Sequence, residues 1–213
     1  MKTRSIITLL LFLSLGLNTS VKAESAKKVL DRTSSLLKSS GGMQATFEAT
    51  AFKGTQEKGI TNGTIYVQGN KFKIVAPQMT TWFDGRTQWS HMAGSGEAYV
   101  STPTEAELQS VNPYTFINLY KSGYASTLSE TNYNGKSCYN VRLVAKNKKA
   151  GIAEMRIIID KTSYLPHSVR IKQSSGDWLR IRVNGVKTGK SWNEGFFRLN
   201  KSDYPDVELI DLR

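Results

Sequence analysis

From residue 43 onward, the sequence alternates between apolar and polar residues with a period of two. The alternation begins with Met43, Ala45, Phe47, Ala49 and Ala51, and a polar residue follows each of the first four. Because successive side chains of a strand point to opposite faces, this pattern predicts strands with one buried and one solvated face. We expect further strands near residues 60–68, 70–76, 79–84, 86–92, 97–101, 124–130, 136–146, 151–160, 167–174, 177–186 and 195–199.

Short turn signals separate many of these strands. Asp84-Gly85, Asn134-Gly135 and Asn184-Gly185 favour two-residue hairpin loops, because both central positions of the favoured turn need positive φ. Strands joined by short hairpins pair antiparallel, whereas parallel neighbours need long crossover connections. The chain therefore predicts an antiparallel meander rather than βαβ units, and hence a mainly β fold with a few helices.

Two segments interrupt this period of two. Residues 24–39 predict an amphipathic helix that ends at Gly41-Gly42. In the middle of the chain, residues 102–108 predict a short helical stretch, and Asn112-Pro113 places a cap residue and a first-turn proline before a helix over 114–121. Helices in these positions can lie across one large curved sheet. The apolar stripe of the first helix consists of Ala26, Val29, Leu30, Thr33, Leu36 and Leu37.

The first 23 of the 213 residues have the pattern of an export signal. A charged start containing Lys2 and Arg4 precedes a nearly unbroken apolar run over 6–17, and Val21-Lys22-Ala23 follows as a cleavage site. A dozen apolar residues are too few to cross about 30 Å of hydrocarbon. Glu24 stands where a lipid-anchored protein would need a cysteine. We therefore expect residues 1–23 to be a cleaved signal peptide and residues 24–213 to form a single exported, soluble domain without a lipid anchor.

The balance of charge is basic. The chain has a formal net charge of +12, and removal of the three basic residues of the signal leaves +9. The basic residues are spread singly along the predicted strands, except for a cluster at 146–149. This distribution favours solvated strand faces over nucleic-acid binding. Cys138 stands alone in the mature chain, so we expect a buried strand cysteine and no internal disulfide.

No catalytic motif is visible in the sequence. His91 and His167 are its two histidines, and they lie on different predicted strands without a matching nucleophile. The chain also lacks a nucleophile elbow, a phosphate-binding glycine loop and the spacing of metal ligands. We expect both histidines to be ordinary strand residues, and we expect no enzymatic activity, no cofactor and no metal.

Bulky apolar side chains are frequent on the predicted strands, and they can form either a packed core or the lining of a cavity. The usual fate is a packed core, but a single sheet with few helices has limited means of filling its concave side. If that side is only covered by a lid, the same residues line a cavity for a large apolar ligand. Because the pleat alternates, Trp82 and Phe83 cannot both point inward, nor can Trp89 and Met92. We expect Trp82 and Trp89 to point inward. The bulky set consists of Phe47, Phe72, Met79, Trp82, Phe83, Trp89, Met92 and Tyr99.

Several short motifs occur in a fixed order along the chain. They are Gly63-Thr64-Ile65-Tyr66-Val67, Asn70-x-Phe72-Lys73, Trp82-Phe83-Asp84-Gly85-x-Thr87-x-Trp89, Asn112-Pro113-Tyr114-Thr115-Phe116 and Asp160-Lys161-Thr162-x-x-Leu165-Pro166. In this order and spacing, and with the opening amphipathic helix, they resemble the periplasmic outer-membrane lipoprotein carrier family, called LolA. The resemblance covers essentially the whole mature chain.

The resemblance implies a fold, a function and partners. The fold is an unclosed antiparallel half-barrel with a helical lid that encloses an apolar cavity. The family carries lipoproteins through the periplasm by shielding their acyl chains, receives them from an inner-membrane ABC-type lipoprotein release complex and delivers them to the outer membrane, where the sequence identifies no acceptor. We expect a monomer whose partners are acylated lipoproteins or lipid. The expected cavity residues are Phe47, Phe72, Ile74, Met79, Trp82 and Trp89 on strands, Phe116 and Leu119 on the lid, and Leu30 and Leu37 on the first helix.

One position departs from the family pattern. Carriers of this family have an arginine just before the turn that leads to Phe72, and that arginine is tied to lid opening and cargo transfer. Here the position is Gln68, whose amide does not offer the fixed fork of donors of a guanidinium. Two alternatives to a carrier therefore remain open. One is an envelope sensor or buffer that binds lipid without transferring lipoproteins, and the other is a structural envelope protein with a fully packed interior.

Overall fold

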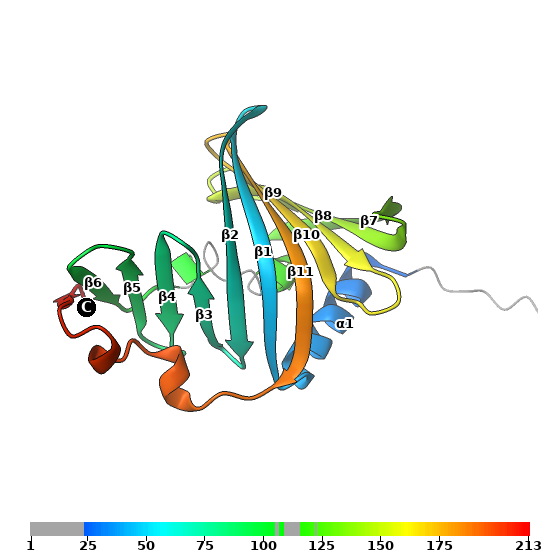
Figure 1. Ribbon diagram of the computed structural model, residues 1–213. Coiled ribbons are helices and arrows are strands. Elements are labelled where there is room, and N and C mark those ends of the chain that lie inside the picture. The colour runs from blue at the N-terminus through cyan, green and yellow to red at the C-terminus, as the bar shows by residue number, and fades with distance from the viewer. Residues whose placement is uncertain (1–23, 105–106, 109–115, 122) are drawn as a thin grey trace, which may run out of the picture.

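A computed structural model of the chain describes residues 24–104, 107–108, 116–121 and 123–213, and its main element is one long sheet (Figure 1). The predicted signal peptide and residues 112–115 at the start of the predicted middle helix lie outside the described residues. The helical elements are α1 (Ala26–Ser39) and the 3-10 helices η1 (Phe116–Lys121), η2 (Glu194–Phe197) and η3 (Lys201–Asp203). The strands are β1 (Gly42–Lys53), β2 (Gln56–Gln68), β3 (Lys71–Val75), β4 (Met79–Phe83), β5 (Gln88–Met92), β6 (Glu97–Ser101), β7 (Tyr124–Tyr133), β8 (Lys136–Ala145), β9 (Ile152–Asp160), β10 (Pro166–Gln173), β11 (Trp178–Lys190) and β12 (Glu208–Asp211).

The twelve strands form one sheet in the order β12-β6-β5-β4-β3-β2-β1-β11-β10-β9-β8-β7. All neighbouring strands pair antiparallel except β12 and β6, which are parallel. The long strands β1, β2 and β11 stand at the centre, with β3 to β6 on one side and β7 to β10 curving away on the other (Figure 1). The edge strands β12 and β7 do not pair with each other, so the barrel is unclosed. The predicted fold class is confirmed.

The helix α1 covers one face of the sheet, which we call the inner face. Its N-cap is Ser25, whose hydroxyl accepts a hydrogen bond from the Lys28 amide. Val29 and Leu30 are fully buried, and Leu119 of η1 is 2% exposed beside them. The strand residues in this core are Val141, Leu143, Met155, Ile157, Ile159, Val169 and Ile171. At about 1.5–3 kcal/mol for each buried aliphatic side chain, this cluster is the main source of stability in this half of the molecule.

The C-terminal segment covers the opposite face, which we call the outer face, over β3 to β6. After β11 the chain crosses the sheet through η2 and η3, and it ends in β12 beside β6 (Figure 1). Trp82 packs there in a cluster with Leu199 and Val207, and Trp89 and Tyr204 pack against that cluster. The molecule therefore has two separate apolar clusters on opposite faces of one sheet.

The structure corrects two local predictions. Residues 195–199 do not form a strand, since η2 occupies 194–197, and β12 lies where we predicted no strand. Asn184-Gly185 is not a hairpin but a bulge within β11, where the four residues from Asn184 to Lys187 lie opposite the three residues from Gln44 to Thr46 of β1. Gly185 has a φ of 55° there. Asn134-Gly135, with φ of 51° and 78°, is the predicted hairpin between β7 and β8.

The structure also describes the position of Cys138 and the length and composition of the helices. Cys138 is fully buried on β8, as expected for a strand cysteine. Within the described ranges, no helix is both long enough and apolar enough to span a bilayer.

Candidate functional site

The inner face is apolar beyond the part that α1 covers. Strand pairing carries it across the centre of the sheet, because residues that face each other on neighbouring strands point to the same side. One such row runs Met43, Val67, Phe72 and Phe83 across β1 to β4, and the next runs Ala45, Ile65, Ile74 and Thr81. On the other side of β1, Phe47 faces Val183 and Ala49 faces Ile181, which packs against the core under α1.

Exposure changes along this face. Phe72 is fully buried and its ring stacks on Phe83 at a centroid distance of 5.1 Å. Farther from α1, Met79 is 45% exposed and its cross-strand neighbour Met92 is 58% exposed. Tyr99 on β6 is 39% exposed. The inner face is therefore a packed core at one end and an open apolar surface at the other.

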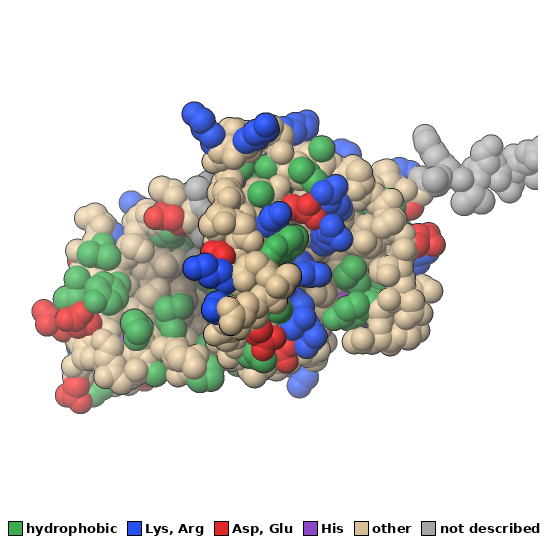
Figure 2. Space-filling model, turned by 90° about the horizontal axis from the view of Figure 1, so that it is seen from above, with side chains coloured by type: hydrophobic (Ala, Val, Ile, Leu, Met, Phe, Trp, Pro, Cys, Tyr) green, Lys and Arg blue, Asp and Glu red, His purple; other side chains and the backbone are tan. Residues whose placement is uncertain are grey.

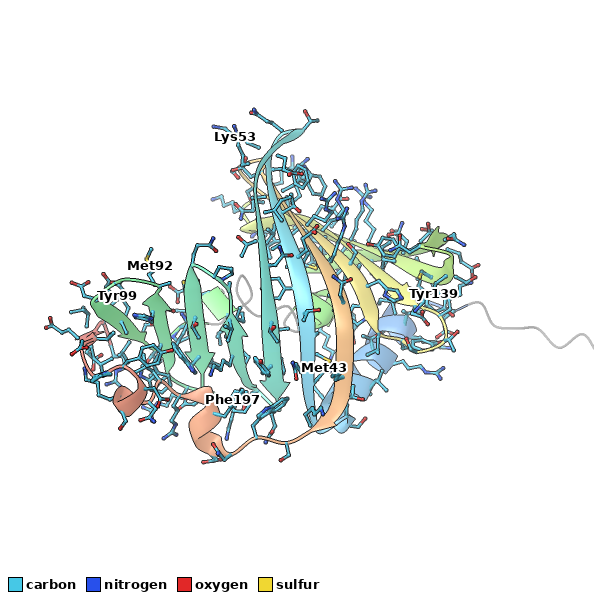
Figure 3. All side chains as sticks on the ribbon, in the orientation of Figure 1. Met43, Lys53, Met92, Tyr99, Tyr139 and Phe197 are labelled. Atoms are coloured by element: carbon cyan, nitrogen blue, oxygen red, sulfur yellow. The ribbon has the colours of Figure 1, made fainter. Side chains whose placement is uncertain are left out.

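The figures show where this open end lies. Met92 and Tyr99 stand on the side of the sheet farthest from α1 (Figure 3). In the view from above, hydrophobic side chains gather on the surface of that same end of the molecule (Figure 2). Methionine side chains are unbranched and polarizable, so they adapt to apolar ligands of irregular shape. A flexible hydrocarbon chain is the kind of ligand that such a surface fits.

Phe47 lies between the two ends and depends on a glycine. A Cβ atom built on Gly63 of the neighbouring strand would lie 2.6 Å from Cζ of Phe47. Real Cβ contacts are not that short, so the absence of a side chain at Gly63 leaves the space that the Phe47 ring occupies. Phe47 itself is half-buried. Because Gly63 has no side chain, the aromatic ring of Phe47 can lie on the inner face between the packed core and the open end.

A polar contact joins the two helical elements over the core. The hydroxyl of Tyr120 on η1 donates a hydrogen bond to the carboxylate of Asp31 on α1, and Lys27 pairs with the same carboxylate at 2.7 Å. The hydrogen bond from Lys27 and that from Tyr120 lower the pKa of Asp31. Burial, followed by the bond to Asp31, raises the pKa of Tyr120 far above its usual range. We call this contact the α1–η1 latch.

The predicted cavity residues divide between the two faces of the sheet. Trp82 and Trp89 face each other on β4 and β5, as expected, but they lie on the outer face and not on the inner one. The reason is that the C-terminal segment supplies a second apolar partner, so the outer face of these strands is buried as well. Phe116 begins η1, and its side chain is outside what the structure describes. The predicted residues on the inner face or under the lid are Leu30, Leu37, Phe47, Phe72, Ile74, Met79 and Leu119.

The outer-face environment of Trp82 is that of a core residue. Its ring meets Tyr204 edge-on at 5.7 Å, and the residue is 2% exposed. The ammonium group of Lys73 lies 5.5 Å from the Trp82 ring and 4.6 Å from the Phe196 ring. Burial lowers the pKa of Lys73. Assigning Trp89 to the inner face had excluded Met92, and Met92 faces inward on β5 together with Gln88 and Ser90.

Gln68 lies on the outer face, away from α1 and η1. Its side-chain oxygen accepts a hydrogen bond from the Trp192 amide at 2.9 Å, and its side-chain nitrogen donates to the Trp192 carbonyl at 3.4 Å. The Trp192 ring packs against Tyr66 and Phe196. Gln68 thus fastens the C-terminal segment to the end of β2. The aromatic residues around Trp192 could have indicated this contact in the sequence, but we did not assign them to a site.

Two depressions lie away from the open end of the inner face. One of about 800 Å³ contains the ion pair between Asp84 and Arg198 at 2.9 Å, together with Asp211 and Arg213. A charged lining of this kind does not match a hydrocarbon chain. The other depression, of about 500 Å³, has a mixed lining in which Thr46, Phe47, Asn62, Thr64, Val75, Pro77 and Asn184 take part.

The two histidines have structural partners. His167 lies 3.2 Å from Asp160, whose carboxylate also accepts the backbone amides of Thr162 and Ser163. Those amide bonds hold the pKa of Asp160 at about 2. The His91 ring nitrogen lies 3.0 Å from the Ser95 carbonyl. Among the described residues, no group of three or more His, Cys, Asp or Glu side chains is placed to hold a metal ion.

Several solved structures are similar to this chain. An uncharacterized conserved protein from Thermus thermophilus is 14% identical, with 87% of this chain and 98% of that chain covered and a TM-score of 0.60. A putative outer membrane lipoprotein-sorting protein domain from Vibrio parahaemolyticus is 13% identical, with 84% and 97% covered and a TM-score of 0.46. MucB in the Pseudomonas aeruginosa MucA/MucB complex is 15% identical, with 87% and 63% covered and a TM-score of 0.45.

At these sequence identities, structural similarity is evidence for a shared fold and for nothing further. Of the three structures, the Thermus protein is the one whose TM-score supports that conclusion. No curated protein matches the chain. The family described as outer membrane lipoprotein carrier protein LolA matches residues 17–175, which is more than half of the chain. This match agrees with the unclosed sheet, the helical cover and the apolar inner face. The chain belongs to the LolA family of outer membrane lipoprotein carrier proteins.

Proposed function

We propose that this protein binds the acyl chains of lipoproteins on its inner face and carries them through the periplasm from the inner to the outer membrane. The observation that supports this most is the open end of the inner face, formed by Met79, Met92 and Tyr99. On the same face, Thr81 and its cross-strand neighbour Ser90 lie between this pair of methionines and the stacked rings of Phe72 and Phe83.

The physical need for such a carrier is large. Burial of one methylene group is worth about 0.8 kcal/mol, so three acyl chains with on the order of 40 methylenes would cost roughly 30 kcal/mol to pass through water. A carrier replaces one apolar environment by another and removes most of that barrier. The ligand must also leave again, and an adaptable apolar face without specific polar contacts permits release.

Loading begins, in this proposal, at the open end and proceeds toward α1. The first part of an acyl chain covers Met79 and Met92, which are exposed in the free protein. The remainder occupies the space between the sheet and the helical cover as the α1–η1 latch between Asp31 and Tyr120 opens. The protein performs no chemistry on its cargo, uses no cofactor and acts as a monomer. Its donor is an inner-membrane ABC-type lipoprotein release complex.

The test compares two double variants that carry the same new charges. Met79→Glu/Met92→Glu alters the inner face, and Val75→Glu/Leu209→Glu alters exposed apolar residues of the outer face. Val75 and Leu209 are 37% and 42% exposed, close to the values for the methionines.

Each protein is added to inner-membrane vesicles that contain an acylated lipoprotein, and soluble lipoprotein is measured. We expect release by the wild type and by the outer-face variant, and loss of release in the inner-face variant. Release that does not depend on any of the proteins would contradict the carrier function.

A second candidate is an envelope protein that binds lipid as a sensor or buffer without passing lipoproteins on. The position of Gln68 favours it, because its side chain hydrogen-bonds to Trp192 and so fastens the C-terminal segment. Such a protein would still take up a fluorescent fatty acid but would release no lipoprotein from vesicles. Uptake that Met79→Glu/Met92→Glu abolishes, combined with absent release by the wild type, would select this candidate.

A further inference from the structure

The outer face of the curved half of the sheet carries a row of arginines. Arg142 on β8 faces Arg156 on β9, Arg156 faces Arg170 on β10, and Arg170 faces Arg180 on β11. Neighbouring strands are about 4.8 Å apart, so the row extends over roughly 15 Å. We call these four residues the arginine row. They lie on the face opposite to the core under α1.

Acidic partners neutralise only part of this row. Glu154 pairs with both Arg142 and Arg156, at 2.7 and 2.8 Å. These two arginines hold the pKa of Glu154 down at about 2. Within the part of the chain that the structure describes, Arg170 and Arg180 form no ion pair. Like charges that face each other across strands are destabilising, so the free protein bears a cost at this row that an anionic ligand would remove.

Aromatic and apolar side chains border the row on the same face. The guanidinium of Arg170 lies 5.2 Å from the Trp178 ring, and Lys172 lies 5.4 Å from the same ring. The guanidinium of Arg180 lies 5.1 Å from the Phe52 ring. Ile60 on β2, in line with the row, is 52% exposed. In the view from above, Lys and Arg side chains gather over the centre and right of the molecule, away from the apolar end at β6 (Figure 2).

We propose that the arginine row, with Lys172 and Trp178, docks the protein on a membrane surface that contains anionic phospholipids. Guanidinium groups bind phosphate oxygens through paired hydrogen bonds, and arginines in line can engage several headgroups at once. Trp178, Phe52 and the exposed Ile60 supply the amphipathic and apolar contacts that favour the headgroup region. This docking surface lies beyond the proposed carrier function and does not depend on it.

A row of charges spread over several strands favours a lipid surface over an acidic peptide. The charged groups lie on four successive strands of a sheet face, and apolar side chains flank them. Docking through the outer face also leaves the inner face turned away from the headgroups. The protein can thus be held at a membrane while its apolar end at Met79 and Met92 stays accessible at the side.

The experiment measures flotation of the full chain with vesicles of phosphatidylcholine alone or of an equal mixture with phosphatidylglycerol. The test variant is Arg170→Glu/Lys172→Glu, which places one carboxylate beside Arg156 and Arg180 and a second beside Glu154. Arg170→Gln/Lys172→Gln serves as a second test variant. The control is Lys28→Glu/Lys38→Glu, an equal change of charge at exposed positions of α1.

We expect the wild type and the control to bind the anionic vesicles and not the neutral ones. Each basic residue near an anionic surface contributes about fivefold, so the glutamate variant should bind at least about thirty-fold more weakly, with the glutamine variant between them. Binding should disappear near 1 M salt, where the Debye length is about 3 Å.

Three results would overturn the proposal. The first is equal binding to neutral and anionic vesicles, and the second is equal binding by the glutamate variant and the control. The third is binding to soluble polyglutamate as tight as to the anionic vesicles, which would assign the arginine row to an acidic protein segment.

Discussion

Replacement of Trp82 by alanine separates the structural role of the outer face from ligand binding. Trp82 is 2% exposed, meets Tyr204 at 5.7 Å and packs with Leu199 and Val207. Truncation of a fully buried tryptophan costs about 3–5 kcal/mol, because it removes apolar contacts and leaves a cavity. For a domain of this size, about 3 °C of melting temperature is lost per kcal/mol, so we expect a decrease of roughly 10 °C.

The assay follows unfolding in urea by far-UV circular dichroism, which does not depend on the removed indole. Binding of a fluorescent fatty acid is then measured at a temperature at which the variant is folded. We expect the destabilisation together with unchanged binding, because Trp82 does not touch the inner face. A cost below about 1 kcal/mol, or loss of binding by the folded variant, would refute the assignment of the two faces.

The remaining predictions concern single polar contacts. Because the folded-state pKa of Asp160 is about 2 and lies below its ordinary value of 3.8, its contribution of about 2 kcal/mol is present above pH 4 and lost as pH falls through 2; a difference in unfolding free energy between the wild type and Asp160→Asn that does not shrink in that window would contradict this. Tyr120→Phe removes the bond to Asp31 and should cost about 1–2 kcal/mol and speed hydrogen exchange in α1; unchanged exchange would exclude a latch. Gln68→Ala should raise proteolysis of the C-terminal segment near Trp192 without changing fatty-acid binding, and equal proteolysis would contradict its fastening role.

Local sequence patterns were sufficient for most of the fold. The three- and four-residue spacing predicted the helix that the structure has at Ala26–Ser39, and alternation predicted the strands from Met43 onward. These patterns work because helix and strand place side chains by fixed periods. The buried position of Cys138 agrees with the usual burial of free cysteines, on which the expectation rested.

Alternation could not show which face of β4 and β5 is the inner one. It correctly placed Trp82 and Trp89 on a common face, but each face of these two strands carries both apolar and polar side chains. Burial of the outer face depends on Leu199, Tyr204 and Val207, which lie more than one hundred residues later in the chain. Contacts at such separation leave no local signal. The choice of Trp89 therefore excluded Met92 from the predicted site.

Two other errors have the same kind of cause. The strand β12 has only four residues and pairs parallel with β6, so neither a hairpin nor an alternating run announces it. Asn184-Gly185 has the composition of a hairpin turn, yet β11 pairs with β1 on both sides of it, which makes it a bulge. In both places the pairing partner, and not the local sequence, decides the structure.

The central claim is that acyl chains bind the inner face at its open end. The most direct measurement is photo-cross-linking of the full chain with a palmitic acid that carries a diazirine near its methyl end, followed by peptide mass spectrometry. We predict labels on Met79, Met92 and Tyr99 and loss of these labels when excess palmitate competes. Labels confined to the outer face around Trp82 and Tyr204, or labels that palmitate does not displace, would contradict the claim.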